Sequence, residues 1–142
     1  MRSLLDVNVL IALHDPQHVH HQRAASWFGR NADQGWASCP LTQNGCLRIM
    51  SLPGYTNPQP LPALVAMLKQ STNTAFHQFW SDDVSLLDGD RFHHLHMHSP
   101  RQLTDIYLLG LAVRNKGRLV TFDIRIPRSA VQGARQDQLV AL

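Results

Sequence analysis

Two short apolar strands, each ending at an aspartate, stand out in the hydrophobic pattern. Residues 3–5 lead into Asp6 and then into the apolar run 7–13, which is typical of a strand buried on both faces of a parallel sheet and the turn after it. Residues 118–122 predict a second buried strand, which delivers Asp123 at its end. Because sites in open α/β sheets form outside the carboxyl ends of the strands, the two aspartates can converge there.

A third aspartate lies on the best-defined helix of the sequence. Ser99 and Pro100 suit the N-cap and the first position of a helix, and the segment 115–117, Asn-Lys-Gly, supplies its C-terminal stop. Apolar residues recur between them at helical spacing and place Asp105 about two turns from the start, on a neighbouring face that is also apolar. A buried carboxylate needs a partner, which can be a metal ion or a hydrogen-bonded arginine.

An amide completes the candidate site. The short strand 36–38 leads into a helix predicted over 40–51, and Gln43 and Asn44 fall in its first turns. Gln43 can ligate through its amide oxygen, bind a metal-bound water, or hydrogen-bond to a backbone group, and the pattern does not choose among these. Three carboxylates and one amide around one spot form a ligand set for a hard divalent cation such as Mg²⁺.

Several spaced segments together carry a resemblance to a known family. They are LLDVNVLIAL, HVHHQRAASWF, WASCPLTQNGCLRIMS and RQLTDIYLLGLAVRNKGRLVTFD. In order and over nearly the whole chain, they resemble the PIN-domain ribonuclease toxins of the VapC type. The resemblance implies an α/β fold over residues 1–142, a three-layer α/β/α PIN-like domain with a central, mainly parallel sheet. It also implies endoribonuclease activity and neutralisation by a small cognate antitoxin, and we expect a homodimer.

By the same resemblance, Asp6, Asp105 and Asp123 take the positions of the family's acidic ligands for Mg²⁺ or Mn²⁺, and Gln43 stands where the family usually has glutamate. The residues expected to orient these ligands by hydrogen bonds are Asn8, Asn44, Thr104 and Thr121. Because Gln43 brings no charge, a catalytically weak or silent PIN fold that binds RNA or an antitoxin without cleavage is the alternative.

A second alternative is an aspartate-nucleophile phosphatase, which also places an aspartate after its first strand. Such enzymes need another aspartate two residues later, where this chain has Asn8. The motif therefore speaks against a phosphatase.

Charge and composition favour an RNA partner. The net charge is +3 and eleven of the thirteen basic residues are arginine, whose planar fork suits phosphate, although a merely solvated basic face is an equal alternative. The candidate RNA-binding residues are Arg48, Arg114 and Arg125. No apolar run has the length of a membrane span and no signal peptide is recognised, so the expected location is the cytoplasm. Cys39 and Cys46 fit that location as reduced core residues.

Two groups of histidines raise the question of zinc. One has helical spacing at 14, 18 and 21, and the other alternates at 94, 96 and 98 as along a strand. Neither has the cysteine or glutamate neighbours of a familiar zinc site, so we expect exposed or hydrogen-bonded histidines. The adjacent acids Asp82 and Asp83 are expected in a turn or a helix cap.

Overall fold

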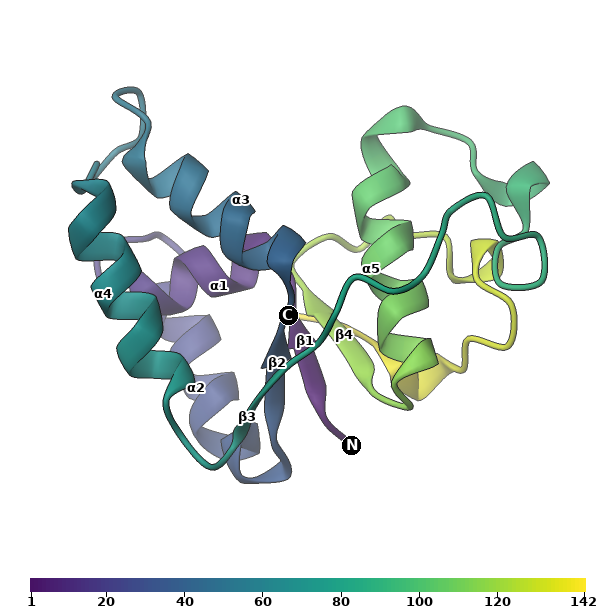
Figure 1. Ribbon diagram of the computed structural model, residues 1–142, viewed down its shortest axis with the longest axis horizontal. Coiled ribbons are helices and arrows are strands. Elements are labelled where there is room, and N and C mark those ends of the chain that lie inside the picture. Colours follow the sequence, from purple (N-terminus) through teal and green to yellow (C-terminus); the bar gives the residue numbers. More distant parts are fainter.

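The chain folds around a five-stranded sheet in which every strand pair is parallel (Figure 1). The computed structural model describes residues 1–142. The strand order across the sheet is β3-β2-β1-β4-β5. The strands are β1 (Ser3–Leu5), β2 (Trp36–Ser38), β3 (His77–Phe79), β4 (Arg118–Thr121) and β5 (Leu139–Ala141). The predicted parallel sheet is confirmed, with β1 and β4 as neighbours near its centre.

Helices cover both faces of the sheet and give three layers (Figure 1). The α-helices are α1 (Val7–His14), α2 (His21–Asn31), α3 (Pro40–Ser51), α4 (Leu61–Thr72) and α5 (Leu103–Arg114). The first four lie on one face, and α5 packs alone against β1 and β4 on the other. Short 3-10 helices cover Ala32–Gln34, His94–His96, Pro100–Gln102, Arg128–Ala130 and Gln136–Gln138. None of the helices is long and apolar enough to cross a membrane.

The two central strands bury side chains on both faces. Leu4 and Leu119 belong to the core between the sheet and α5, whereas the adjacent Leu5 and Val120 belong to the core under α1 to α4. Strands in such a sheet carry apolar residues at every position rather than at alternate ones. This two-sided burial explains why both strands could be recognised as short apolar runs.

The apolar run after Asp6 forms a helix, so its assignment to a strand and the following turn was wrong. Asp6 has extended backbone angles and its side chain accepts a hydrogen bond from the Val7 N–H, which makes it the N-cap of α1. Helix α1 is enclosed by α2, α3 and β4. Because partners surround it, apolar residues occupy almost all of its faces, and the helical period is lost from the sequence.

Other predicted elements agree closely with the structure. Helix α3 and strand β2 have the predicted bounds. The predicted cap of the aspartate-bearing helix is confirmed, because the Ser99 side chain accepts from the Arg101 N–H, although its first turn is a 3-10 helix. After β3 the chain crosses over α5 and forms no further strand before β4.

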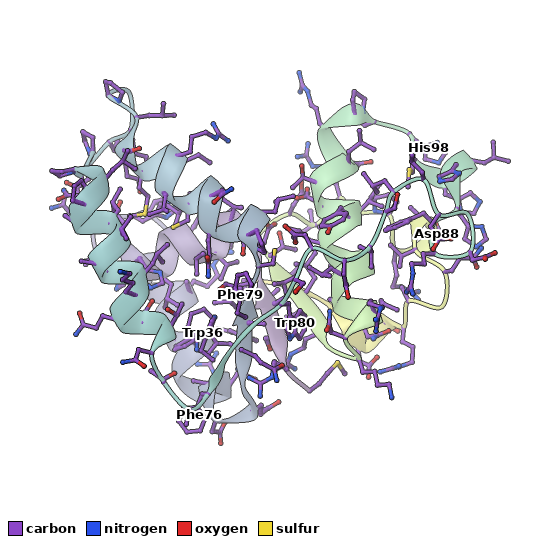
Figure 2. The ribbon with its side chains drawn as sticks, viewed as in Figure 1. Trp36, Phe76, Phe79, Trp80, Asp88 and His98 are labelled. Carbon is purple, nitrogen blue, oxygen red and sulfur yellow. The ribbon has the colours of Figure 1, made fainter.

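The histidine groups do not form the regular arrays that their spacing suggested. Helix α1 ends at His14, whose ring contacts the Leu10 carbonyl at 2.8 Å and the Ser71 hydroxyl at 2.9 Å. His94–His96 is a 3-10 helix rather than a strand, and His98 lies on the side of the molecule away from Trp36 (Figure 2). Cys39 and Cys46 are buried free thiols, as expected.

Gly110 permits close packing of α5 on the buried Phe92, and its replacement tests that core. A Cβ atom at Gly110 would lie 2.4 Å from Phe92 Cζ. Overpacking of a core costs about 1–3 kcal/mol, which exceeds the roughly 0.5–1 kcal/mol that alanine gains over glycine in a helix. We expect Gly110→Ala to lower the free energy of unfolding, measured by urea denaturation. Gly29→Ala in α2 is the matched control, because nothing lies within 4 Å of its Cβ position, and it should be stabilising.

Candidate active site

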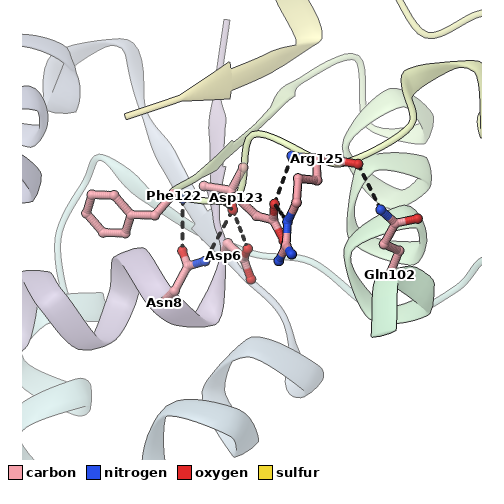
Figure 3. Close-up of polar contacts among 7 residues, drawn as sticks. Asp6, Asn8, Gln102, Phe122, Asp123 and Arg125 are labelled. Carbon is pink, nitrogen blue, oxygen red and sulfur yellow. Dashed lines mark hydrogen bonds and ion pairs between the residues drawn. The ribbon is translucent and has the colours of Figure 1, made fainter. Parts of the chain in front are cut away.

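The hydroxyl of Thr121 joins the two strand-end aspartates (Figure 3). Thr121 is fully buried, and its Oγ1 donates to Asp6 Oδ2 at 2.6 Å and accepts from the Asp123 N–H at 3.0 Å. Both contacts follow from the parallel register, which pairs Leu5 with Val120 and brings the two strand ends together. A single hydroxyl therefore fixes the position of Asp6 and the start of the loop that carries Asp123.

Asn8 adds a second link between the first turn of α1 and this loop. Its Nδ2 donates to Thr121 Oγ1 at 3.3 Å, and its Oδ1 accepts from the Phe122 N–H at 3.2 Å (Figure 3). The side chains of Asn8 and Thr121 thus occupy positions from which they can orient Asp6 and Asp123. Their effect on a metal ligand set stays a prediction.

Asp105 approaches Asp6 from the opposite layer, across a cavity of about 990 Å³. The polar residues that line it are Asp6, Asn8, Asn44, Arg48, Ser51, Thr104 and Asp105. The cavity therefore takes its walls from α1 and α3 on one side of the sheet and from the start of α5 on the other. Its apolar lining, which includes Ile11, Leu41 and Leu61, was not recognised in the sequence because it is drawn from three helices far apart in the chain.

Burial and like charge act together on the acidic residues. Asp6 is only 3% exposed, and burial raises its pKa, an effect increased by the charge of Asp123 and opposed by the hydrogen bonds from Thr121 and Val7. Burial, followed by the charges of Asp6 and Asp123, raises the pKa of Asp105 from 3.8 to about 6. Asp6 and Asp123 therefore lie close enough to Asp105 to disfavour its ionisation, and Asp123 acts in the same way on Asp6.

Asp123 differs from the other two because it has a cationic partner. Arg125 Nε lies 3.1 Å from Asp123 Oδ1 and Arg125 Nη2 lies 3.2 Å from Oδ2 (Figure 3). These side-chain bonds, together with a bond from the Arg125 backbone N–H, lower the pKa of Asp123. The arginine partner that the sequence offered as the alternative to a metal is thus present, but on Asp123 rather than on Asp105.

The donors of this site are of the chemical type that binds a hard divalent cation, but they are spread apart and do not converge on one point. Carboxylate oxygens are the ligands that Mg²⁺ prefers, and a dication would relieve the repulsion among Asp6, Asp105 and Asp123. No three His, Cys, Asp or Glu side chains are close enough to form a complete ligand group in this arrangement. The carboxylate of Asp123 is engaged by Arg125 instead of facing the other two.

Gln43 is held by a neighbouring strand. Its Nε2 donates to Ser38 Oγ at 2.9 Å, and the Ser38 hydroxyl contacts His77 Nε2 at 2.8 Å. Gln43 does not line the acidic cavity, and its partner is a side chain rather than the backbone group that the sequence suggested. These three hydrogen-bonded residues lie on separate elements, Gln43 on α3, Ser38 on β2 and His77 on β3. No local sequence pattern could therefore reveal the interaction.

The three candidate arginines have different surroundings. Arg48 is exposed and lines the cavity, whereas Arg114 lies at the end of α5 and pairs with Asp83 at 3.6 Å. Asp82 Oδ2 accepts from the Leu41 N–H in the first turn of α3, a helix whose N-cap is Cys39, so it satisfies a helix N–H from a distant segment and is not a local cap. Of the three, only Arg48 lines the cavity, while Arg125 is paired with Asp123.

Known proteins give the family of the chain. No protein-family model matches the sequence. Ribonuclease VapC44 of Mycobacterium tuberculosis is 48% identical over 142 residues, covering all of both chains. The chain belongs to the VapC ribonuclease family. Ribonuclease VapC39 of the same organism is 44% identical over 134 residues, which are 94% of this chain and 96% of VapC39.

Solved structures of VapC proteins have the same fold. VapBC2 from Rickettsia felis, bound to a DNA fragment from its promoter, aligns with a TM-score of 0.60 at 11% identity, over 100% of this VapC chain and 98% of the other. The Mycobacterium tuberculosis VapC20, a toxin that cleaves the sarcin-ricin loop, aligns with a TM-score of 0.56 at 10% identity, over 82% and 85% of the two chains. At such low identity they support the fold alone, and the α/β PIN-like prediction is confirmed.

The raised pKa of Asp105 predicts a pH-dependent stability of this VapC protein without metal. The native state binds this proton more tightly than the unfolded chain, so the contribution is present below pH 3.8 and is lost as the pH rises through about 6. In EDTA, we expect the free energy of unfolding of the wild type, relative to Asp105→Asn, to fall by on the order of 2 kcal/mol between pH 4 and 7. Urea denaturation at several pH values measures this difference, and a constant difference would contradict the assigned environment.

The bond between Gln43 and Ser38 predicts the effect of a carboxylate at this position. A carboxylate in place of the amide would be an acceptor only, so the Ser38 hydroxyl would donate to it and would accept from His77, which favours a protonated imidazole. The pKa of His77 is now lowered by burial and by Arg2, and Gln43→Glu should raise it in an NMR titration of the ring. Gln43→Met removes the hydrogen bond without adding charge and is the control. An unchanged His77 pKa in Gln43→Glu would mean that the carboxylate has left Ser38.

Proposed function

We propose that this VapC ribonuclease is a Mg²⁺-dependent endoribonuclease, with Mn²⁺ as a substitute, that hydrolyses RNA at the cavity between α1, α3 and α5. One observation carries the proposal: Asp6 and Asp105 line one cavity from two layers of the fold, with Asp123 at the neighbouring strand end, and the charges of Asp6 and Asp123 raise the pKa of Asp105. Like charge that the protein compensates only in part destabilises the free protein, so its presence favours a role in binding a cation.

Mg²⁺ bound there would polarise the scissile phosphate and lower the pKa of a bound water, which supplies the nucleophile and leaves a 5′-phosphate and a 3′-hydroxyl. Asp6, Asp105 and Asp123 would hold the ion, and Thr121 and Asn8 would keep the Asp6 carboxylate oriented. No histidine lines the cavity, so histidine-based cleavage through the 2′-hydroxyl has no candidate residue there.

The cavity walls would position the RNA. Arg48 and Asn44 are exposed on neighbouring turns of α3 and both line the cavity, so they can bind successive phosphates as RNA crosses it. Arginine is suited to this role because its planar fork binds phosphate in a bidentate manner. The apolar residues of the wall would contact ribose and base, and would limit the access of water.

A toxin role in a toxin-antitoxin pair follows from family membership. VapBC2 of Rickettsia felis is a complex of this kind, and we propose a small cognate antitoxin as the partner of this chain. A homodimer and a cytoplasmic location complete the proposal. The alternative is a silent VapC fold that binds RNA or the antitoxin without cleavage, which the neutral Gln43 and its bond to Ser38 favour.

Cleavage of total RNA with 5′- and 3′-end mapping tests the proposal. We expect cleavage that requires Mg²⁺ and stops with EDTA, and Asp105→Asn should lower the rate more than roughly 100-fold, beyond the usual effect of losing an outer-shell partner. Asp88→Asn is the control, because Asp88 is an exposed acid paired with Arg91 away from the cavity. RNA binding without any cleavage would favour the silent alternative, and products with 2′,3′-cyclic phosphates would contradict the metal-water chemistry.

A further inference from the structure

Arg125 folds back over the acidic residue that precedes it by two positions (Figure 3). Its guanidinium contacts both carboxylate oxygens of Asp123, and its backbone N–H donates to Asp123 Oδ1 at 2.8 Å. The Arg125 carbonyl accepts from Gln102 Nε2 at 2.9 Å, next to the start of α5. The backbone of Arg125 is thus fixed between the acidic loop and α5, and only its side chain is free to move.

The two members of this ion pair differ greatly in exposure. The Arg125 side chain is 77% exposed, whereas the Asp123 side chain is only 19% exposed. An exposed ion pair contributes little to stability, because holding a long side chain in one place costs conformational entropy. The contact is therefore one that a stronger cation can displace without unfolding the loop.

Arg125 is also the only cation that acts on the acidic residues. It lowers the pKa of Asp123 and opposes the rise in the pKa of Asp105, so its charge is felt by two of the three carboxyl groups. In this arrangement its guanidinium occupies one face of both Asp123 oxygens, and no complete ligand group is present. A divalent cation that binds Asp123 through both oxygens must replace these contacts.

We propose that Arg125 is an internal counter-cation that holds Asp123 when no metal is bound and leaves it when Mg²⁺ binds. Arg125 is thus a positioning residue that competes with the metal and keeps Asp123 ionised and ordered in the free protein. The released guanidinium stays tethered beside the cavity, where a phosphate can take the place of the carboxylate as its partner. This inference rests on the proposed metal-dependent function.

Calorimetric titration with Mn²⁺ compares the wild type with Arg125→Gln. Because the variant removes the competitor, we expect Mn²⁺ to bind roughly three- to fivefold more tightly, the range that the upper values for exposed ion pairs allow. Arg135→Gln is the matched control: Arg135 contacts Asp137 with the same pair of nitrogens, at 3.0 and 3.4 Å, away from the cavity. The control removes one positive charge and one ion pair of the same kind, and it should leave Mn²⁺ affinity unchanged.

Proton-nitrogen NMR of the arginine Nε–H groups follows the displacement in the wild type. We expect the Arg125 resonance to shift on addition of Mg²⁺, with the same midpoint as metal binding, while the Arg135 resonance stays in place. If Arg125→Gln does not fold, Arg125→Lys keeps the charge without the two parallel bonds and should show a smaller gain in Mn²⁺ affinity.

These experiments distinguish failure of the counter-cation role of Arg125 from failure of the proposed metal-dependent function. The counter-cation role would be contradicted if Mn²⁺ bound to the wild type and to Arg125→Gln with equal affinity. It would also be contradicted if the Arg125 resonance did not shift on addition of Mg²⁺. Either result would leave the proposed nuclease function intact. An equal gain in Mn²⁺ affinity in Arg135→Gln would mean that the effect comes from the overall charge of the protein, and it would also contradict the counter-cation role of Arg125. Absence of Mn²⁺ binding to both proteins would overturn the metal-dependent function and this inference with it.

Discussion

The acidic cavity depends on the parallel pairing of β1 with β4. That register ends both strands at the same edge of the sheet and places the Thr121 hydroxyl 2.6 Å from Asp6 Oδ2. Antiparallel strands would have put the two aspartates at opposite edges. Because each strand is buried on both faces, a shift in register would also expose core residues such as Leu5 and Val120. The same apolar side chains that hold the sheet together therefore fix the position of the acidic residues.

Like charges at this edge oppose the folded state, and the structure limits that cost in two ways. Thr121 and the Val7 N–H donate to Asp6, and Arg125 neutralises Asp123, whereas Asp105 has no protein donor and has a pKa of about 6. The two carboxyl groups with hydrogen-bond donors thus lie at the strand ends, and the one without a donor faces them from α5. Ionisation of Asp105 therefore opposes folding most strongly, and the proposed metal site would need that same ionised carboxylate.

The similarity to VapC proteins establishes the family and the fold, whereas the local geometry identifies the hydrogen-bond and ion-pair partners of the site residues. Near-full-length relatives at 48% and 44% identity establish the family, and solved structures at 10–11% identity show that the fold persists when most of the sequence has changed. The geometry adds what family membership does not, namely the partner of each carboxylate. Gln43 of α3 is bonded to Ser38 of β2 and does not line the cavity.

The sequence by itself determined the elements whose signals are local. Caps and helical spacing located α3 and α5, and short apolar runs ending at Asp6 and Asp123 located the central strands. The tertiary structure decided the rest. It made the run after Asp6 a helix, because a segment enclosed by partners on all sides carries no period. It also paired Asp123 with Arg125 and Gln43 with Ser38, because a side chain's partner depends on distances in space, which neighbouring residues do not encode.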